Sequence, residues 1–328
     1  MLKKICLLLA CAILFSGCLN QPQANTNSQQ IFNANRVLLY IQDGQIYAAE
    51  EDGQDPVNVS NNNKENFSPV WITKGAEALF IAKQNEYYEV WQTNLESEDT
   101  QLLWGSKKEP NLIALSPDNL WLTYAEEGGC FLFNKEEKNA TRISEECNFL
   151  SWAHKKKRFV YISEDKLFVR DFNIKQDLSE PKEIYSGELQ YPLFLDDNTI
   201  IFEAPDENSD PATHDIYKLS LEDSVKTAIT DLNWPGHENV RLAISPDKEK
   251  IAYSFDEETW LIPIASPELA KQVLTKASDL IWDMESSGYY YTAEEVDENN
   301  ELRHNIYRAT KDGLNKQLII NNAEKPVL

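Results

Sequence analysis

The chain has 328 residues, enough for one large domain or two domains of ordinary size. Hydrophobic residues make up 42% of the chain and charged residues 26%, which is the composition of a folded protein and excludes a disordered one. The net charge of −23 excludes nucleic-acid binding, because the chain lacks the basic footprint that a phosphate backbone requires.

The first 17 residues have the organisation of an export signal. Lys3 and Lys4 precede a continuous apolar run at 5–15, which is too short to span a bilayer as a helix and has the length of a signal-peptide core. Residues 14–18 then read Leu-Phe-Ser-Gly-Cys, which resembles the cleavage site (lipobox) of bacterial lipoproteins. The resemblance implies cleavage before Cys18 and acylation of that cysteine with chains such as palmitate. An ordinary cleaved secretory signal is the alternative.

The segment that follows the cysteine is predicted to be a tether. Residues 18–35 carry no charge and are rich in Gln and Asn, so we expect them to be disordered. In a Gram-negative bacterium Asp after the acylated cysteine favours inner-membrane retention, so Leu19 suggests sorting to the outer membrane. We therefore expect a folded domain at 36–328, held to an envelope membrane through Cys18 and facing the periplasm if the cell is Gram-negative.

The remaining cysteines fit an exported chain. Cys6 and Cys11 leave with the signal, whereas Cys130 and Cys147 form an even pair in an oxidising compartment. We expect either a disulfide between them or two buried free thiols.

One repeat accounts for the rest of the chain. Each unit begins with an apolar anchor and continues with three further short β segments. Successive anchors are 37 to 50 residues apart, and they are Trp71, Leu115, Trp152, Phe194, Ile244 and Trp282. Four short strands at a pitch near forty residues are typical of the blades of a β-propeller. The sequence therefore predicts an all-β fold.

The two ends of the chain predict how the ring closes. Residues 37–60 contain only three β segments, without an anchor strand, and Pro326-Val327-Leu328 repeats the pattern of Pro69-Val70-Trp71. We expect the C-terminal strand to complete the first blade, because closure removes exposed strand edges. This gives seven four-stranded blades. Six is the alternative.

Turn sequences within the repeat resemble a known family. Ser-Pro-Asp occurs at 116–118 and 245–247, Ile-Ala-Tyr at 251–253, and Asp-Gly turns at 52–53 and 312–313. These residues resemble the TolB-type (WD40-like) propeller repeat over roughly 37–328, although the Pro-Asp turn is absent from the fourth, fifth and seventh units. The resemblance implies a propeller but no particular activity. The repeat occurs in TolB of the periplasm, in prolyl-oligopeptidase propellers and in some polysaccharide lyases.

Acidic loops form the candidate binding face. In a propeller the loops between second and third strands share a face with the connections between blades. Two such loops are long here, at 203–215 and 294–304, and the blade between them carries a third acidic turn. The predicted residues are Glu203, Asp206, Glu207, Asp210, Asp256, Glu257, Glu258, Glu294, Glu295, Asp297, Glu298 and Glu301. They could receive a basic protein segment or a hard cation, or could simply be solvated.

Histidines supply a weaker candidate. His214 and His304 occupy matching places in two units, and His237 falls on the same face. Histidines gathered on one face could be metal ligands or general bases. The repeat itself explains two of the three. No Gly-x-Ser-x-Gly, phosphate-binding Gly-rich loop, Cys-x-x-Cys or His-Glu-x-x-His occurs. We therefore predict no catalytic residue, no cofactor and no metal.

The sequence favours a monomeric propeller that serves as a protein-binding or envelope-assembly module. Its expected partners are the membrane, through the lipid, and another envelope protein with a basic segment. The alternatives are a carbohydrate-binding or carbohydrate-processing propeller, dependent on a metal or not, and a purely structural repeat protein. An apolar patch beside the acidic loops would favour the protein partner.

Overall fold

The computed structural model describes residues 35–172, 177–206, 213–231, 234–235 and 240–328. The chain divides into two compact units, residues 1–31 and 32–328, and every described residue belongs to the second. The predicted signal peptide (1–17), Cys18 and all but the last residue of the predicted tether (18–35) lie outside the described residues. Within the described ranges, no helix has the length and apolarity needed to cross a membrane.

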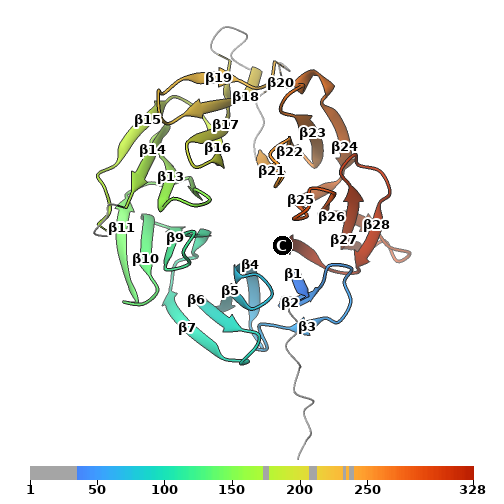
Figure 1. The fold of residues 1–328 in the computed structure, drawn as a ribbon. Helices are drawn as coiled ribbons and strands as arrows, with labels where there is room; N and C mark the ends of the chain where they lie inside the picture. The colour runs from blue at the N-terminus through green and yellow to red at the C-terminus, as the bar shows by residue number, and fades with distance from the viewer. Residues whose placement is uncertain (1–34, 173–176, 207–212, 232–233, 236–239) are drawn as a thin grey trace, which may run out of the picture. The chain divides into compact units, whose positions relative to one another are not determined.

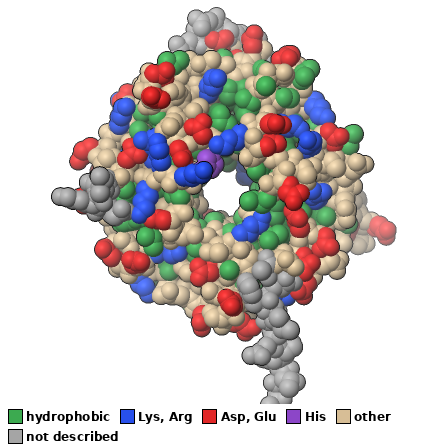
Figure 2. Space-filling view, in the orientation of Figure 1, with side chains coloured by type: hydrophobic (Ala, Val, Ile, Leu, Met, Phe, Trp, Pro, Cys, Tyr) green, Lys and Arg blue, Asp and Glu red, His purple; other side chains and the backbone are tan. Residues whose placement is uncertain are grey.

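The described residues form seven antiparallel sheets arranged as the blades of a propeller, as the sequence predicted (Figure 1). The fold is all-β apart from one 3-10 turn, η1 (Pro267–Leu269). Within each blade the strands run from the innermost to the outermost, and the innermost strands surround a central opening that Figure 2 shows. The seven-bladed prediction is confirmed over the six-bladed alternative.

The first four blades have four strands each. Blade one contains β29 (Glu324–Val327), β1 (Arg36–Gln42), β2 (Gln45–Glu50) and β3 (Val57–Asn58). Blade two contains β4 (Glu65–Thr73), β5 (Glu77–Gln84), β6 (Tyr87–Asn94) and β7 (Thr100–Ser106). Blade three contains β8 (Asn111–Leu115), β9 (Trp121–Glu126), β10 (Gly129–Asn134) and β11 (Asn139–Ser144). Blade four contains β12 (Phe149–Trp152), β13 (Arg158–Ser163), β14 (Lys166–Asp171) and β15 (Lys182–Ser186).

The last three blades follow the same order. Blade five contains β16 (Gln190–Asp196), β17 (Thr199–Pro205), β18 (Thr213–Ser220) and β19 (Lys226–Ala228), and β20 (Trp234–Pro235) also pairs with β18. Blade six contains β21 (Arg241–Ile244), β22 (Lys250–Phe255), β23 (Glu258–Pro263) and β24 (Lys271–Thr275). Blade seven contains β25 (Ala277–Trp282), β26 (Gly288–Val296), β27 (Leu302–Thr310) and β28 (Gln317–Ile320).

The two ends of the propeller meet in blade one. The C-terminal strand β29 pairs antiparallel with β1, with Val327 opposite Leu39 and Glu324 opposite Ile41. The predicted closure by the C-terminal strand is therefore confirmed. Blades seven and one also share an apolar cluster, in which Tyr290 packs with Tyr40, so the closure is supported by packing as well as by backbone pairing.

The sequence anchors lie on innermost strands and hold neighbouring blades together. The indole Nε1 of Trp71 donates to the Val37 carbonyl at 2.9 Å, and that of Trp282 donates to the Ala243 carbonyl at 3.1 Å. In both cases the acceptor belongs to the preceding blade. An apolar ring with a single polar donor suits this position, because the ring fills the inner core while the N–H finds a partner.

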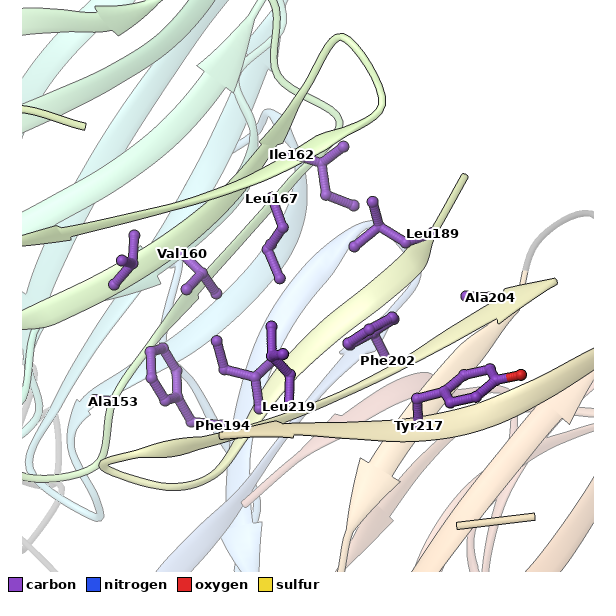
Figure 3. Packing of buried hydrophobic residues seen from close by; sticks show 12 residues of the cluster. Ala153, Val160, Ile162, Leu167, Leu189, Phe194, Phe202, Ala204, Tyr217 and Leu219 are labelled. Carbon is purple, nitrogen blue, oxygen red and sulfur yellow. The ribbon is translucent and has the colours of Figure 1, made fainter. Parts of the chain in front are cut away.

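The core consists of apolar layers between blades. In one layer Val160 and Leu167 of blade four face Phe194, Phe202 and Leu219 of blade five (Figure 3). Central strands are covered on both faces, since a neighbouring blade lies on each side of every sheet. This explains why their sequences are continuous apolar runs instead of alternating patterns.

Candidate functional site

The topology defines one face on which the predicted acidic loops emerge. Neighbouring strands are antiparallel, so loops between second and third strands share a face with the connections between blades. We call this the connection face. Its seven second-to-third loops, in blade order, are Asp43-Gly44, Asn85-Glu86, Glu127-Gly128, Glu164-Asp165, 206–212, Asp256-Glu257 and 297–301. The three predicted loops are those of blades five to seven.

Most of the predicted acidic residues that the structure describes reach solvent. Asp256, Glu257, Glu294, Glu295, Glu298 and Glu301 are exposed, and Asp206, Glu258 and Asp297 are half-buried. Glu207 and Asp210 lie outside the described residues. The topology thus brings acidic side chains of three consecutive blades to one face.

Glu203 is a correction to this set. It lies inside β17, not in the loop, and it is 1% exposed. Its carboxylate meets the Nδ1 atom of His214 at 2.6 Å, within a buried group that also contains Asp215. Burial, reinforced by the charges of Glu188 and Asp215, raises the pKa of Glu203 to about 8. Glu203 is therefore buried in blade five against His214, and it is not part of a binding surface.

The acidic character of the connection face extends beyond the predicted three blades. Each of the seven second-to-third loops contains at least one Asp or Glu. The signal was present in the sequence, but it becomes visible only when the repeats are aligned by strand. Acidic residues therefore occur in the second-to-third loops of all seven blades, and not only in those of blades five to seven.

Turn geometry accounts for only part of this acidity. Both residues of the turns at 164–165 and 256–257 have positive φ, between 44° and 64°. Such turns favour Asn, Asp and Gly, so Asp165 and Asp256 have a conformational reason to be there. Glu164 and Glu257 have no such conformational reason, because residues other than Gly, Asn and Asp are disfavoured at positive φ. Their charge is therefore not explained by the backbone.

The β26–β27 hairpin adds an apolar feature to the acidic face. Val296 and Leu302 form a cross-strand pair at its end and are 62% and 60% exposed. Residues 297–301, directly beyond them, include Asp297, Glu298 and Glu301. An exposed apolar pair thus lies beside acidic loops, which is the feature that the sequence analysis expected of a surface with a protein partner.

The tip of this hairpin is internally bonded. The Asp297 carboxylate accepts the backbone N–H groups of Asn299 at 2.8 Å and Glu301 at 2.9 Å, and it pairs with Arg303 at 2.5 Å. The backbone N–H of Glu301 contributes most to holding the pKa of Asp297 below its usual range. The tip therefore presents Val296 and Leu302 from a defined conformation.

Two depressions flank the hairpin. One, of about 470 Å³, lies between Leu302 and the Asp43-Gly44 turn of blade one, and the other, of about 400 Å³, adjoins Val296. Arg303 and Asn322 line both. The exposed apolar pair thus stands between two polar hollows large enough to take side chains of a partner.

Of the three candidate histidines, the two that the structure describes lie in different blades and do not share a metal site. His304 lies 3.4 Å from Glu294 and 3.5 Å from Glu324, in blades seven and one, whereas His214 is buried against Glu203 in blade five. His237 lies outside the described residues. In the part of the chain that the structure describes, no group of three His, Cys, Asp or Glu side chains could hold a metal ion.

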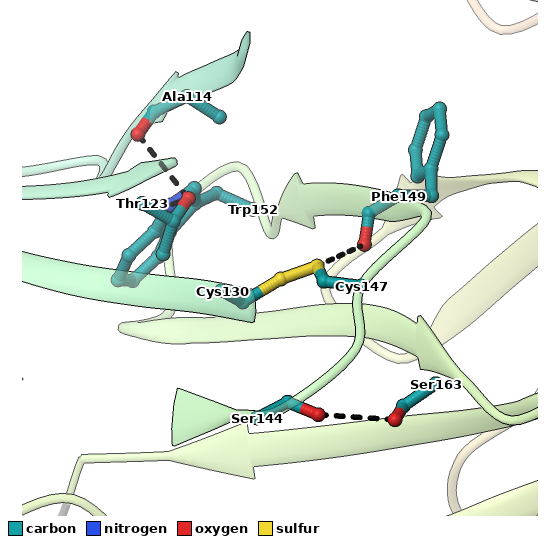
Figure 4. Close-up of a disulfide and its surroundings, with 8 residues drawn as sticks. All are labelled: Ala114, Thr123, Cys130, Ser144, Cys147, Phe149, Trp152 and Ser163. Carbon is teal, nitrogen blue, oxygen red and sulfur yellow. Dashed lines mark hydrogen bonds between the residues drawn. A yellow bond between two sulfur atoms is a disulfide. The ribbon is translucent and has the colours of Figure 1, made fainter. Parts of the chain in front are cut away.

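Cys130 and Cys147 are joined in a disulfide (Figure 4). Their Cα atoms are 5.4 Å apart, within the usual range for such bonds. Cys130 lies on β10 and Cys147 in the connection to blade four, so the bond ties two blades together. Nearby, the Trp152 indole donates to the Thr123 hydroxyl at 2.9 Å, again across blades three and four.

The fold resembles that of several solved propellers at low sequence identity. TolB from Acinetobacter baumannii is 10% identical, with a TM-score of 0.51 over 88% of this chain and 80% of that one. An oligogalacturonate lyase from Vibrio parahaemolyticus is 16% identical, with a TM-score of 0.57 over 84% of each chain. The dihydro-heme d1 dehydrogenase NirN is 10% identical, with a TM-score of 0.61 over 90% of this chain and 75% of that one.

These likenesses show the fold alone. They confirm the propeller fold that the turn sequences predicted, which TolB proteins share. No protein-family model matches the chain, and no curated protein matches it.

Proposed function

We propose that this chain is a lipid-anchored module of the bacterial cell envelope that binds another envelope protein through its connection face. The observation that carries the proposal is the exposed pair Val296 and Leu302, set among acidic side chains. Exposure of an apolar pair to water is unfavourable, and a partner that covers the pair would remove this exposure. The surrounding carboxylates favour a partner with basic residues beside an apolar one.

The two features have different roles in such an interface. Burial of Val296 and Leu302 would supply the apolar core of the contact, which a polar rim surrounds. The carboxylates of Glu294, Glu298 and Glu301 would attract and orient a basic segment, because complementary charge acts mainly on encounter and specificity. Binding is therefore expected to weaken as salt concentration rises.

The lipid anchor is part of this proposal. Acylation of Cys18 would hold the propeller near the membrane, and the uncharged segment before residue 36 would allow it to reorient. The connection face would then be free to meet partners within the envelope, on the outer membrane if the cell is Gram-negative.

In-cell crosslinking followed by mass spectrometry tests the proposal. The wild-type chain is compared with a triple variant carrying Glu294→Gln, Glu298→Gln and Glu301→Gln. A matched control carries Glu96→Gln, Glu98→Gln and Asp99→Asn in the β6–β7 turn, which is exposed on the opposite face. We expect one envelope protein to be captured by the wild type and the control but not by the connection-face variant. Capture that is equal in all three would overturn the proposal.

A further inference from the structure

A ring of seven side chains surrounds the mouth of the central channel at the connection face. Leu328 is the anchor of blade one, since Pro326-Val327-Leu328 matches Pro69-Val70-Trp71. The position three residues before each anchor, in blades one to seven, carries Lys325, Ser68, Leu112, Phe149, Tyr191, Arg241 and Asp279. Each lies in the first half of its innermost strand, at the end nearer the connection face. The repeat therefore places one side chain per blade around the same opening.

A bulge occurs at this position in five blades. Ser68, Leu112, Tyr191, Asp279 and Lys325 all have positive φ, between 50° and 53°. Each falls where the pairing of its innermost strand with the second strand shifts register. A bulge turns a side chain out of the regular alternation of a strand. A non-glycine residue at positive φ is conformationally unfavourable, and this strain occurs in five blades around the same opening.

The ring is divided by chemistry. Four consecutive blades, six, seven, one and two, contribute Arg241, Asp279, Lys325 and Ser68. The other three contribute Leu112, Phe149 and Tyr191. The Phe149 and Tyr191 rings pack with their centroids 4.6 Å apart. One arc of the mouth is therefore charged or polar, and the other is apolar and aromatic.

A cavity of about 290 Å³ lies where the two arcs meet, next to Tyr191 and Arg241. Five of the seven ring residues line it, all but Leu112 and Phe149. Its remaining wall is mostly apolar and includes Leu242, Ala252, Leu280 and Val327. The volume is at the lower end of the range for small-molecule sites, and mostly apolar walls with a few polar groups are typical of them.

The charge inside the cavity is positive, although the chain as a whole is acidic. The Asp279 carboxylate accepts from the Arg241 guanidinium through one oxygen and from the Ser278 hydroxyl through the other. Arg241 is 53% exposed, so part of its guanidinium remains accessible beside its bond to Asp279. No carboxylate of the described residues forms an ion pair with Lys325, whose ammonium is the second cation of the lining. The lining therefore contains two cations, Arg241 and Lys325, and one carboxylate, Asp279, which already accepts two hydrogen bonds.

We propose that this cavity binds a small monocarboxylate with an apolar or aromatic body. The carboxylate would pair with Arg241, whose planar guanidinium matches it with two parallel hydrogen bonds, and with Lys325. The apolar body would rest against Tyr191 and the aliphatic wall. A free small acid and the C-terminus of a polypeptide share this chemistry. The site does not depend on the protein partner proposed above, because it uses different residues.

Isothermal titration calorimetry on the full chain, purified in a non-ionic detergent, tests the site. The probes are 4-phenylbutyrate and its uncharged amide, with N-acetyl-Leu-Phe in its free-acid and amidated forms to distinguish the two sources. We expect each acid that fits to bind about tenfold more tightly than its amide. Tighter binding of the peptide acid would assign the site to a chain terminus, and tighter binding of phenylbutyrate to a free small acid.

Variants assign the binding to the cavity. Arg241→Gln and Lys325→Gln are each expected to weaken 4-phenylbutyrate binding about tenfold. Lys276→Gln, which removes an exposed lysine of the same face outside the cavity, leaves it unchanged. Lys325 is exposed, so its variant tests the site even if Arg241→Gln disturbs folding. Equal affinity for acid and amide, or binding that neither cavity variant weakens, would overturn the proposal.

Discussion

The Arg241 guanidinium donates to the Asp279 carboxylate across blades six and seven, although the two residues are 38 positions apart in the chain. Both occupy the position three residues before an anchor, so the repeat explains why they meet. The pair links two blades and at the same time restrains the cation that faces the channel cavity.

Asp279→Asn separates these two roles. Removal of the carboxylate frees the guanidinium and makes the cavity more positive, so 4-phenylbutyrate should bind several-fold more tightly by calorimetry. Arg241 is half-exposed, so the loss of the pair should lower the free energy of unfolding by no more than about 1 kcal/mol in urea titrations. Weaker binding of the acid would show that Asp279 is needed to position Arg241.

Glu203 makes stability depend on pH. Its pKa is raised by burial to about 8, above the value in the unfolded chain, so the folded state holds the proton more tightly. The contribution of Glu203 to stability is therefore greatest below the unfolded pKa and falls as pH rises toward 8. Glu203→Gln should remove this fall: the variant should match the wild type near pH 4.5 and melt several degrees higher near pH 8. Parallel pH profiles of the two proteins would contradict this.

The disulfide should stabilise the junction of blades three and four. It closes a segment with a sequence separation of 17, for which the loss of chain entropy predicts about 3 kcal/mol. Cys147→Ser, or reduction of the wild type, should lower the free energy of unfolding by roughly that amount in guanidinium titrations. The reductant should have no effect on the variant, which serves as the control.

The C-terminal strand should be essential for a closed ring. Removal of residues 324–328 exposes the edge of β1 and takes Val327 from its apolar cluster. We expect a loss on the order of 3 kcal/mol in the free energy of unfolding and concentration-dependent association through the open edge. Analytical ultracentrifugation would detect the association. A truncated chain that stays monomeric and melts with the wild type would contradict the role of the closure.

The fold could be predicted from sequence because the repeat has a regular physical cause. Anchors such as Trp71 and Trp282 recur at blade pitch since each must fill the same inner core position. The same count of β segments per unit showed that an anchor strand is missing near residue 37 and that an extra one occurs at the C-terminus. Strand pairing then required no further information.

The site was less predictable because it depends on strand ends and register. Glu203 looks like a loop residue in the sequence, but β17 extends to Pro205 and carries it into the core. The exposure of Val296 and Leu302 follows from their pairing at the hairpin end, which hydrophobicity alone does not reveal. The channel ring depends on bulges, and nothing in residues as different as Ser68 and Asp279 signals a shared backbone conformation.

The lipid anchor is tested separately from binding. Cys18→Ser should move the chain from the membrane fraction to the soluble fraction of lysed cells, and labelling with an alkyne fatty acid should disappear. Fractionation of the unchanged chain after high-salt washing is the control, because a lipid anchor resists salt. A Cys18→Ser chain that remains labelled would show that acylation occurs elsewhere.

Site-specific photocrosslinking in cells shows whether the β26–β27 hairpin contacts a protein partner. A photoreactive residue replaces Val296 in one strain and Leu314 in another. Leu314 is also about 60% exposed, and it lies in the β27–β28 turn on the opposite face. We expect one discrete crosslinked envelope protein from position 296 and none from position 314. No crosslink from 296 above that from 314 would contradict it.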